Sequence, residues 1–144
     1  MLRAKYSSRT SLFFERFRVR KNRAKRDSIY SVSGLIARSA RQSLRIRKGP
    51  SRAGAIPHAH TRGGLRIIQF AVDGNSSIIG PIRFPRSRQY NQPIPSIHEF
   101  GKTVYELFRD RSKTFPQRPY MGPTIKRLGN KIPRHFSASV ARVL

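Results

Sequence analysis

The 144-residue chain has no cysteine, no tryptophan, only six acidic residues and no long apolar run. The absence of cysteine excludes a disulfide framework, a thiolate zinc site and a cysteine nucleophile. No stretch approaches the roughly 20 apolar residues that a membrane span requires. We therefore expect a soluble or assembled protein with no membrane partner.

The scarcity of acids also argues against catalysis. The six lie far apart along the chain, at Glu15, Asp27, Asp73, Glu99, Glu106 and Asp110. No acid pair stands out for general acid–base chemistry, and there is neither a nucleophile elbow nor a glycine-rich phosphate loop of the Walker or Rossmann type. The sequence predicts a protein that is not an enzyme and holds no cofactor.

The histidines raise the question of a metal site. His58 and His60 are two residues apart in a Gly- and Pro-rich segment, and His98 could approach them from a later strand. Zinc needs three or four ligands and a supporting second layer of hydrogen bonds, which this chain is poorly equipped to supply. The alternative is a rigid loop whose imidazoles bond locally, and we predict no metal.

What the chain has in excess is positive charge. It carries 31 Lys and Arg residues, which gives a net charge of +25 at pH 7. A protein this basic repels copies of itself unless anionic surfaces absorb the charge. The charge therefore requires an anionic neighbour, and by itself it does not choose among nucleic acid, an anionic membrane and an acidic assembly partner.

Residues 1–26 form a predicted basic arm. The segment holds ten basic residues and one acid, and the aromatic cluster of Phe13, Phe14 and Phe17 lies inside it. Such a composition fits phosphate contact with ring stacking on bases, an amphipathic helix docked on a protein, or a mitochondrial transit peptide. The predicted polyanion or acidic-partner contacts in the arm are Arg16, Arg18, Arg20, Lys21, Arg23, Lys25 and Arg26.

A helix is predicted to begin with Asp27 as N-cap and to end at Gly49 and Pro50. Residues at the three and four spacing of one helical face follow, namely Ile29, Val32, Ile36, Ala40, Ser43 and Leu44. The opposite face carries Arg38, Arg41 and Arg45. That row is either a solvated face or a further polyanion contact.

After a loop over residues 49–64, a β-hairpin is predicted. An apolar run at 65–72 and a second strand at 76–80 flank the turn signal Asp73-Gly74-Asn75. A polar loop follows at 81–95. Residues 97–104 are then expected to return as strand, with 105–108 as an extension, although the nearby acids leave a short helix as the alternative.

A closing helix is expected after Pro119. Its predicted apolar stripe is Met121, Ile125, Leu128 and Ile132, and Pro133 is expected to interrupt it. Residues 27–136 then make one small α+β domain consisting of a long helix, a small antiparallel sheet and a C-terminal helix. Residues 137–144 are expected to be a tail.

The order of several short motifs resembles a known family. The motifs are the Thr61 to Arg66 stretch with Gly64 and Leu65, the hairpin end at Gly80 and Pro81, the Glu99-Phe100-Gly101 stretch, and the Arg118-Pro119-Tyr120-Met121-Gly122-Pro123 stretch. In this order, over about residues 28–136, they resemble the neck and tail-completion proteins of long-tailed bacteriophages, the small head-to-tail joining family. The chain departs from the family pattern by an additional glycine in the first motif, a longer basic arm and an insertion-like segment at 105–117.

The resemblance implies a structural virion protein, assembled in the host cytoplasm and located at the neck or tail junction. It implies a homo-oligomeric ring between portal or head-closure proteins and the tail, around the DNA channel. The matched residues would specify fold and subunit contacts, and the basic residues would make non-specific DNA contact.

The sequence leaves open the partner of Glu99 and the class of structural protein. Glu99, an acid in a very basic chain, is expected to pair with an arginine, either within the subunit or across a subunit boundary. The rival class is an RNA-bound structural protein such as a ribosomal or organellar ribosomal protein, which shares the basic extension, the lack of cysteine and the small α+β body.

Overall fold

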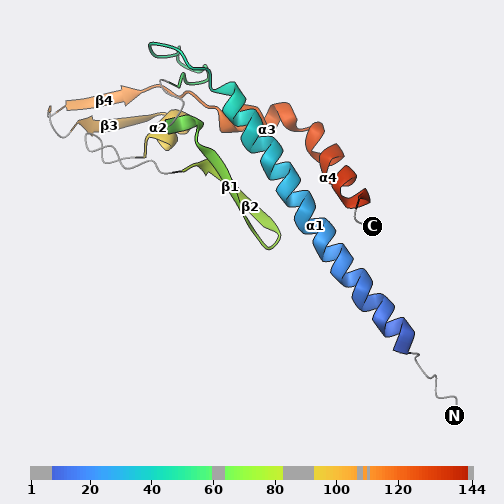
Figure 1. The fold of residues 1–144 in the computed structure, drawn as a ribbon. Coiled ribbons are helices and arrows are strands. Elements are labelled where there is room, and N and C mark those ends of the chain that lie inside the picture. The colour runs from blue at the N-terminus through green and yellow to red at the C-terminus, as the bar shows by residue number, and fades with distance from the viewer. Residues whose placement is uncertain (1–7, 60–63, 83–92, 107–108, 110, 143–144) are drawn as a thin grey trace.

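The computed structural model describes the fold of residues 8–59, 64–82, 93–106, 109 and 111–142 (Figure 1). It is an α+β fold, as predicted. One long helix, α1, extends through it, and the first of two small antiparallel hairpins and the C-terminal helices lie along one half of that helix. The second hairpin extends away beyond the C-terminal end of α1. The other half of α1 projects away from the body toward the N-terminus.

Helix α1 spans Ser8–Ser43. The prediction that it begins at Asp27 is wrong, because residues 8–26 contain no proline or glycine and are rich in good helix formers. Asp27 lies inside the helix, where its carboxylate is 3.8 Å from Arg23 Nε one turn earlier. The described part of the predicted arm is therefore the first half of a helix of 36 residues, about 54 Å long at 1.5 Å per residue.

The first hairpin is confirmed. Strand β1 (Ile68–Asp73) pairs antiparallel with β2 (Ser76–Pro81), with Asp73 opposite Ser76 across a two-residue turn. Gly74 in the turn has φ of +54°, a conformation that glycine adopts without strain. The strand begins three residues later than predicted because Gly64–Arg66 form a short 3₁₀ helix, η1.

A second hairpin follows a short helix. Helix α2 (Ile94–Phe100) begins beside Pro93 and Pro95 and ends at Gly101, so the expected strand from 97 to 100 is wrong and the helical alternative holds there. Strand β3 (Lys102–Glu106) then pairs with β4 (Arg111–Phe115). Most of the segment that the sequence suggested as an insertion, residues 105–117, thus belongs to a regular hairpin.

The C-terminal region contains two helices. Helix α3 covers Met121–Leu128 and α4 covers Lys131–Ala141, so the interruption is at Gly129 and Asn130 rather than at Pro133. Pro133 lies in the first turn of α4, where a missing N–H breaks no helical hydrogen bond. The predicted tail is helical up to Ala141.

The apolar stripe predicted for the closing helix is partly wrong. Thr124 and Leu128 are buried, whereas Ile125 is 46% exposed. The reason is that the helix begins after the buried Tyr120, which sets a face one residue earlier than the pattern of large apolar residues suggested.

The core lies against the second half of α1. It is formed by Ala37, Ala40, Leu44, Ala59, Leu65, Ile68 and Tyr120. Phe70 of β1 packs close to α1, with ring atoms 3.8 Å from the position that a Cβ on Gly34 would occupy. Small residues of α1 therefore allow the hairpin to approach the helix closely.

Further toward the N-terminus, α4 covers α1 through two buried serines. The Ser28 hydroxyl donates to the carbonyl of Ala24 at 2.7 Å, and the Ser33 hydroxyl contacts both the carbonyl of Ile29 and the Ser77 hydroxyl. These serines were not part of the predicted apolar face. They are buried because they lie where α4 and the hairpin contact the helix, and their hydroxyls bond within the structure.

Candidate polyanion-binding site

The first half of α1 exposes both its charges and its aromatic rings. Every described side chain from residue 12 to 23 is exposed, including Phe13, Phe14 and Phe17 at 65%, 64% and 50%. The seven predicted contact residues from Arg16 to Arg26 are all exposed as well. The aromatic cluster and the basic residues therefore share one solvent-facing helical segment.

Some of these cations have neighbours on the helix. Arg18 lies 4.0 Å from the Glu15 carboxylate, and the Arg26 guanidinium lies over the ring of Tyr30 at 5.7 Å. Exposed pairs of this kind contribute about 0–1 kcal/mol. The segment thus remains strongly cationic.

The arginine row at 38, 41 and 45 is not one helical face, because α1 ends at Ser43 rather than at the predicted Gly49 and Pro50, and Arg45 lies beyond it. All three side chains are exposed, and the Arg41 Nε donates to the carbonyl of Ala37 at 3.4 Å. Of the three arginines, Arg45 is the one that lines the basic pocket described next.

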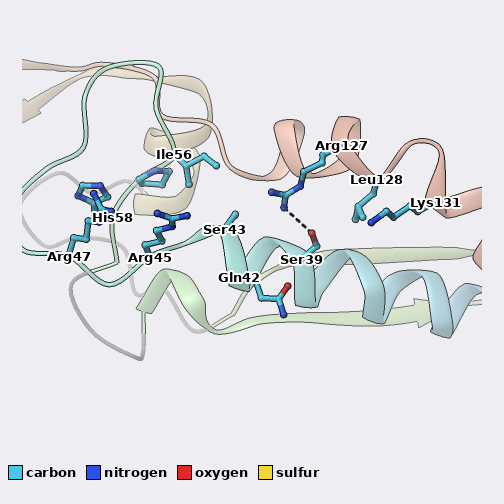
Figure 2. A pocket seen from close by; sticks show the side chains of 11 residues that line it. Ser39, Gln42, Ser43, Arg45, Arg47, Ile56, His58, Arg127, Leu128 and Lys131 are labelled. Atoms are coloured by element: carbon cyan, nitrogen blue, oxygen red, sulfur yellow. Dashed lines mark hydrogen bonds between the residues drawn. The ribbon is translucent and has the colours of Figure 1, made fainter.

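This pocket has a volume of about 580 Å³ and lies between the C-terminal end of α1, the loop around residue 57, and the junction of α3 and α4 (Figure 2). Its lining residues are Ser39, Gln42, Ser43, Arg45, Arg47, Ile56, Pro57, His58, Arg127, Leu128 and Lys131. Among the residues that the structure describes, the lining contains four Arg or Lys residues and no carboxylate. The space is therefore strongly favourable for an anion.

Several of the polar side chains in the pocket are oriented by hydrogen bonds. Arg127 of α3 donates from Nη2 to the Ser39 hydroxyl of α1 at 3.0 Å, and Figure 2 shows this link between the two helices. The His58 Nδ1 lies 3.2 Å from the carbonyl oxygen of Gly49, and the Ser43 hydroxyl donates to the carbonyl of Ala40. These contacts hold groups on opposite sides of the pocket in place.

Sequence reasoning found Arg45 but missed Arg47, His58, Arg127 and Lys131 as members of one site. They come from segments up to 86 residues apart, and no spacing rule connects such positions. Only the packing of α3 and α4 beside the end of α1 brings them together.

The motif residues occupy structural positions. Thr61 lies outside the described residues. Gly64, Leu65 and Arg66 form η1, with Leu65 buried in the core, while Gly80 and Pro81 end β2 opposite Gln69 and Ile68. They shape the end of the first hairpin.

The last two motifs contact each other directly. The Glu99 carboxylate accepts hydrogen bonds from the backbone N–H groups of Tyr120, Met121 and Gly122 at 3.0, 3.1 and 2.9 Å. Among the described residues, the partner of Glu99 is not the expected arginine, because the unpaired N–H groups and positive end of α3 bind the carboxylate instead. Pairing with an arginine across a subunit boundary stays a prediction. Glu99 thus joins α2 to the start of α3.

Other contacts reinforce this junction. The Arg118 N–H donates to the carbonyl of His98 at 2.7 Å, and the Arg118 Nε donates to the carbonyl of Ser51 at 2.9 Å. Gly101 has φ of +65°, and a Cβ there would lie 2.9 Å from the backbone nitrogen of Gln117. Phe100 is 75% exposed, and Pro119 and Pro123 flank the helix start.

Tyr120 lies at the centre of the junction. Its side chain is 1% exposed, and burial, followed by the negative charge of Glu99, raises its pKa from 10.0 to about 12. Both causes disfavour the tyrosinate. Tyr120 is therefore a neutral core residue at physiological pH.

Among the described residues, no three His, Cys, Asp or Glu side chains are grouped closely enough to hold a metal ion. His60 lies outside that part of the chain. In the same part, no helix combines the length and the apolar character needed to cross a membrane. Comparison with protein-family models, with curated proteins and with solved structures finds no match to this chain.

Proposed function

We propose that this chain is a structural subunit of a tailed-phage virion. In this proposal it forms a homo-oligomeric ring in the neck or tail-completion region, where it joins the portal or head-closure proteins to the tail around the DNA channel. It has no catalytic role. The motif order and three features of the molecule support this function.

The observation that carries the proposal is the uncovered half of α1. Five large apolar side chains are at least 50% exposed there, namely Leu12, Phe13, Phe14, Phe17 and Val19. An exposed apolar surface of this kind marks an interaction site in a soluble protein. A subunit that docks this helix on its neighbours or on portal and tail proteins would bury these side chains.

The contact between the family-like motifs is a second support. Glu99, Gly101, Arg118 and Tyr120 form one junction that determines where α3 and α4 leave the body. The structural role of these residues in the junction accounts for the motif pattern without any catalytic chemistry. A structural role for the matched stretches is what the resemblance implies.

The third support is the charge. A net charge of +25 on each subunit would be multiplied in a ring, and a DNA channel is a site where such charge is favourable. The exposed cations of α1 and of the basic pocket are available for non-specific contact with DNA or with acidic neighbours.

The test is localisation in purified virions. We expect mass spectrometry to detect the chain in virions and electron microscopy of labelled particles to locate it at the neck. We also expect the purified protein to form a closed oligomer by mass measurement. Absence of the chain from the neck would overturn the proposal.

The second candidate is an RNA-bound structural protein of the ribosomal type. It is favoured by the combination of exposed phenylalanines and arginines on α1, since such surfaces also stack on and neutralise RNA. Genes for portal, capsid and tail-tube proteins beside this one would support the phage function. Ribosomal genes beside it would support the alternative.

A further inference from the structure

We propose that the pocket between α1, the loop around Pro57 and the α3–α4 junction is a binding site for a run of neighbouring phosphate groups, such as the backbone of a nucleic acid. This inference rests on the proposed function only in naming DNA as the natural source of the phosphates. The site itself is argued from its own residues, and its test is separate from that of the ring.

The lining of the pocket carries positive charge that no acid in the lining compensates. Arg45, Arg47, Arg127 and Lys131 line one space of about 580 Å³ without any carboxylate among the lining residues. The acids whose side chains the structure describes are placed elsewhere. Glu15 and Asp27 lie beside arginines on α1, Asp73 is the last residue of β1, and Glu99 caps α3.

Bringing four cations to one concave surface is unfavourable unless an anion joins them. A binding partner with several closely spaced negative charges would remove that repulsion.

The cations of the pocket lie in two groups. Figure 2 shows Arg45, Arg47 and His58 grouped toward one end of the pocket, and Arg127 and Lys131 toward the other end. One small anion would satisfy only one end. A ligand with charges spaced along its length, as in a nucleic-acid strand or a linear polyphosphate, would contact both groups.

A hydrogen bond orients one of the cationic donors in the pocket. The bond from Arg127 to Ser39 holds one guanidinium at the pocket, so less side-chain freedom is lost when a ligand binds. Guanidinium groups present planar pairs of N–H donors that match phosphate oxygens. Lys131 is also the first residue of α4, where the positive end of the helix adds to the field.

The types of cation in the pocket favour phosphate over carboxylate ligands. Three of the four cations are arginines, and phosphate groups offer several oxygens for their forked contacts. Each unit of a phosphodiester chain carries one charge close to the backbone, whereas an acidic peptide carries its carboxylates on flexible side chains whose ordering opposes binding. The pocket therefore favours phosphates over acidic peptide.

The test is fluorescence anisotropy of the full chain with a labelled 20-base-pair DNA and with the corresponding single strand, at several salt concentrations. The double variant Arg45→Gln/Arg127→Gln is compared with Arg134→Gln/Arg142→Gln, which removes the same charge from exposed residues of and beside α4 outside the pocket. We expect only the pocket variant to lower the salt slope for the duplex, by about 0.9 for each lost phosphate contact. Equal effects of the two double variants would overturn the site.

A second variant tests positioning without a change of charge. Ser39→Ala removes the acceptor of Arg127, and we expect about a two- to fivefold weaker DNA affinity with an unchanged unfolding temperature. Ser31→Ala, the same substitution at an exposed position of α1 that does not line the pocket, is the matched control. Unchanged affinity of Ser39→Ala would overturn the orientation argument.

Competition identifies the source of the phosphates. Tripolyphosphate that displaces DNA from the native protein but displaces it less well from the pocket variant would support a phosphate site and show that free polyphosphate also fits. DNA binding through the pocket without competition by tripolyphosphate would support a backbone site alone. Poly-glutamate that competes as well as tripolyphosphate at equal charge would overturn the proposal in favour of an acidic peptide.

These outcomes are independent of the proposed ring. The pocket variants should leave the oligomer mass unchanged, because the exposed apolar half of α1 is intact in them. If the unmodified protein formed no ring, the proposed function would be overturned. The DNA-binding comparison of the pocket variants would still test the phosphate site.

Discussion

The Glu99 carboxylate caps the helix that starts after Tyr120, with Oε2 3.0 Å from the Tyr120 backbone nitrogen. The residues are 21 positions apart, and the same carboxylate also accepts from the next two N–H groups of α3. A helix usually obtains its cap from the residue just before it. Here the cap comes from α2, so one acid both satisfies α3 and fixes its position on the body.

Replacing Glu99 by glutamine should destabilise the fold. The amide keeps one acceptor oxygen but loses the negative charge at the positive end of α3 and brings an NH₂ group toward N–H donors. We expect a loss of about 1–3 kcal/mol in the free energy of unfolding, measured by urea denaturation. Glu15→Gln, which affects an exposed pair with Arg18, is the control and should cost less than about 0.5 kcal/mol. Equal effects of the two substitutions would contradict the capping role.

Gly101→Ala should also be strongly destabilising. Gly101 combines φ of +65° with ψ of 154°, a region that only glycine populates readily, and an added Cβ would lie 2.9 Å from the Gln117 nitrogen. We expect a loss of about 2–5 kcal/mol from conformation and overlap together. Gly49→Ala is the matched control, since Gly49 has φ of +82° but open space around it, and it should cost about 1–2 kcal/mol. If both variants were equally stable, the close packing at Gly101 would be refuted.

Tyr120 should make stability fall at alkaline pH. Its pKa is about 12 in the folded chain against an ordinary value of 10.0, so the folded state holds the proton more tightly. The corresponding stability, about 2–3 kcal/mol, is fully present below pH 10 and is lost as the pH rises through 12. Urea denaturation from pH 9 to 12 should therefore show a steeper decline for the native chain than for Tyr120→Phe. Tyr105→Phe, at a 50% exposed position, should decline like the native chain, and an identical decline in all three proteins would contradict this explanation.

The apolar residues at the start of α1 should control assembly. In the proposed ring, Phe13→Gln/Phe17→Gln removes side chains that dock on a neighbour, so we expect the oligomer to dissociate in light-scattering measurements. The monomer should keep its unfolding temperature, because both rings are exposed in the single chain. Ile125→Gln, another exposed apolar position, should leave the oligomer intact. An oligomer that survives the double substitution would show that this part of α1 is not the docking segment.

The cations of the same helix should act on nucleic-acid binding instead. The triple variant Arg16→Gln/Arg18→Gln/Arg20→Gln should lower the salt slope of DNA binding by about 0.9 for each phosphate contact that is lost. Its effect should add to that of the pocket variant if both surfaces contact the same duplex. An unchanged slope would assign these arginines to an acidic protein partner or to solvent.

Local patterns in the sequence were sufficient for much of the fold. The first hairpin follows from the apolar run before the turn signal at Gly74 and Asn75, and the second half of α1 follows from Ile36, Ala40 and Leu44. Both depend on neighbours within a few residues. The true start of α1 was missed because Asp27 satisfies the rule for a cap, although the preceding residues favour helix equally well.

The second hairpin was harder to predict. Strand β4 (Arg111–Phe115) contains exposed charged and polar residues in place of an apolar alternation, so its pairing with β3 leaves little periodic signal. The Glu99 cap was missed for a different reason. The sequence showed an acid in need of a partner, but a backbone N–H group leaves no trace in the residue types.

The sequence by itself determined that this protein is strongly cationic, lacks cysteine chemistry and has an α+β pattern of helices and one clear hairpin. These properties are sums or short-range periodicities, which do not depend on where the chain folds back. Only the tertiary structure decided that Glu99 caps α3, that Arg45 shares a pocket with Arg127 and Lys131, and that the aromatic half of α1 stays uncovered. Each of these depends on contacts between distant segments, whose partners are chosen by packing around the buried half of α1.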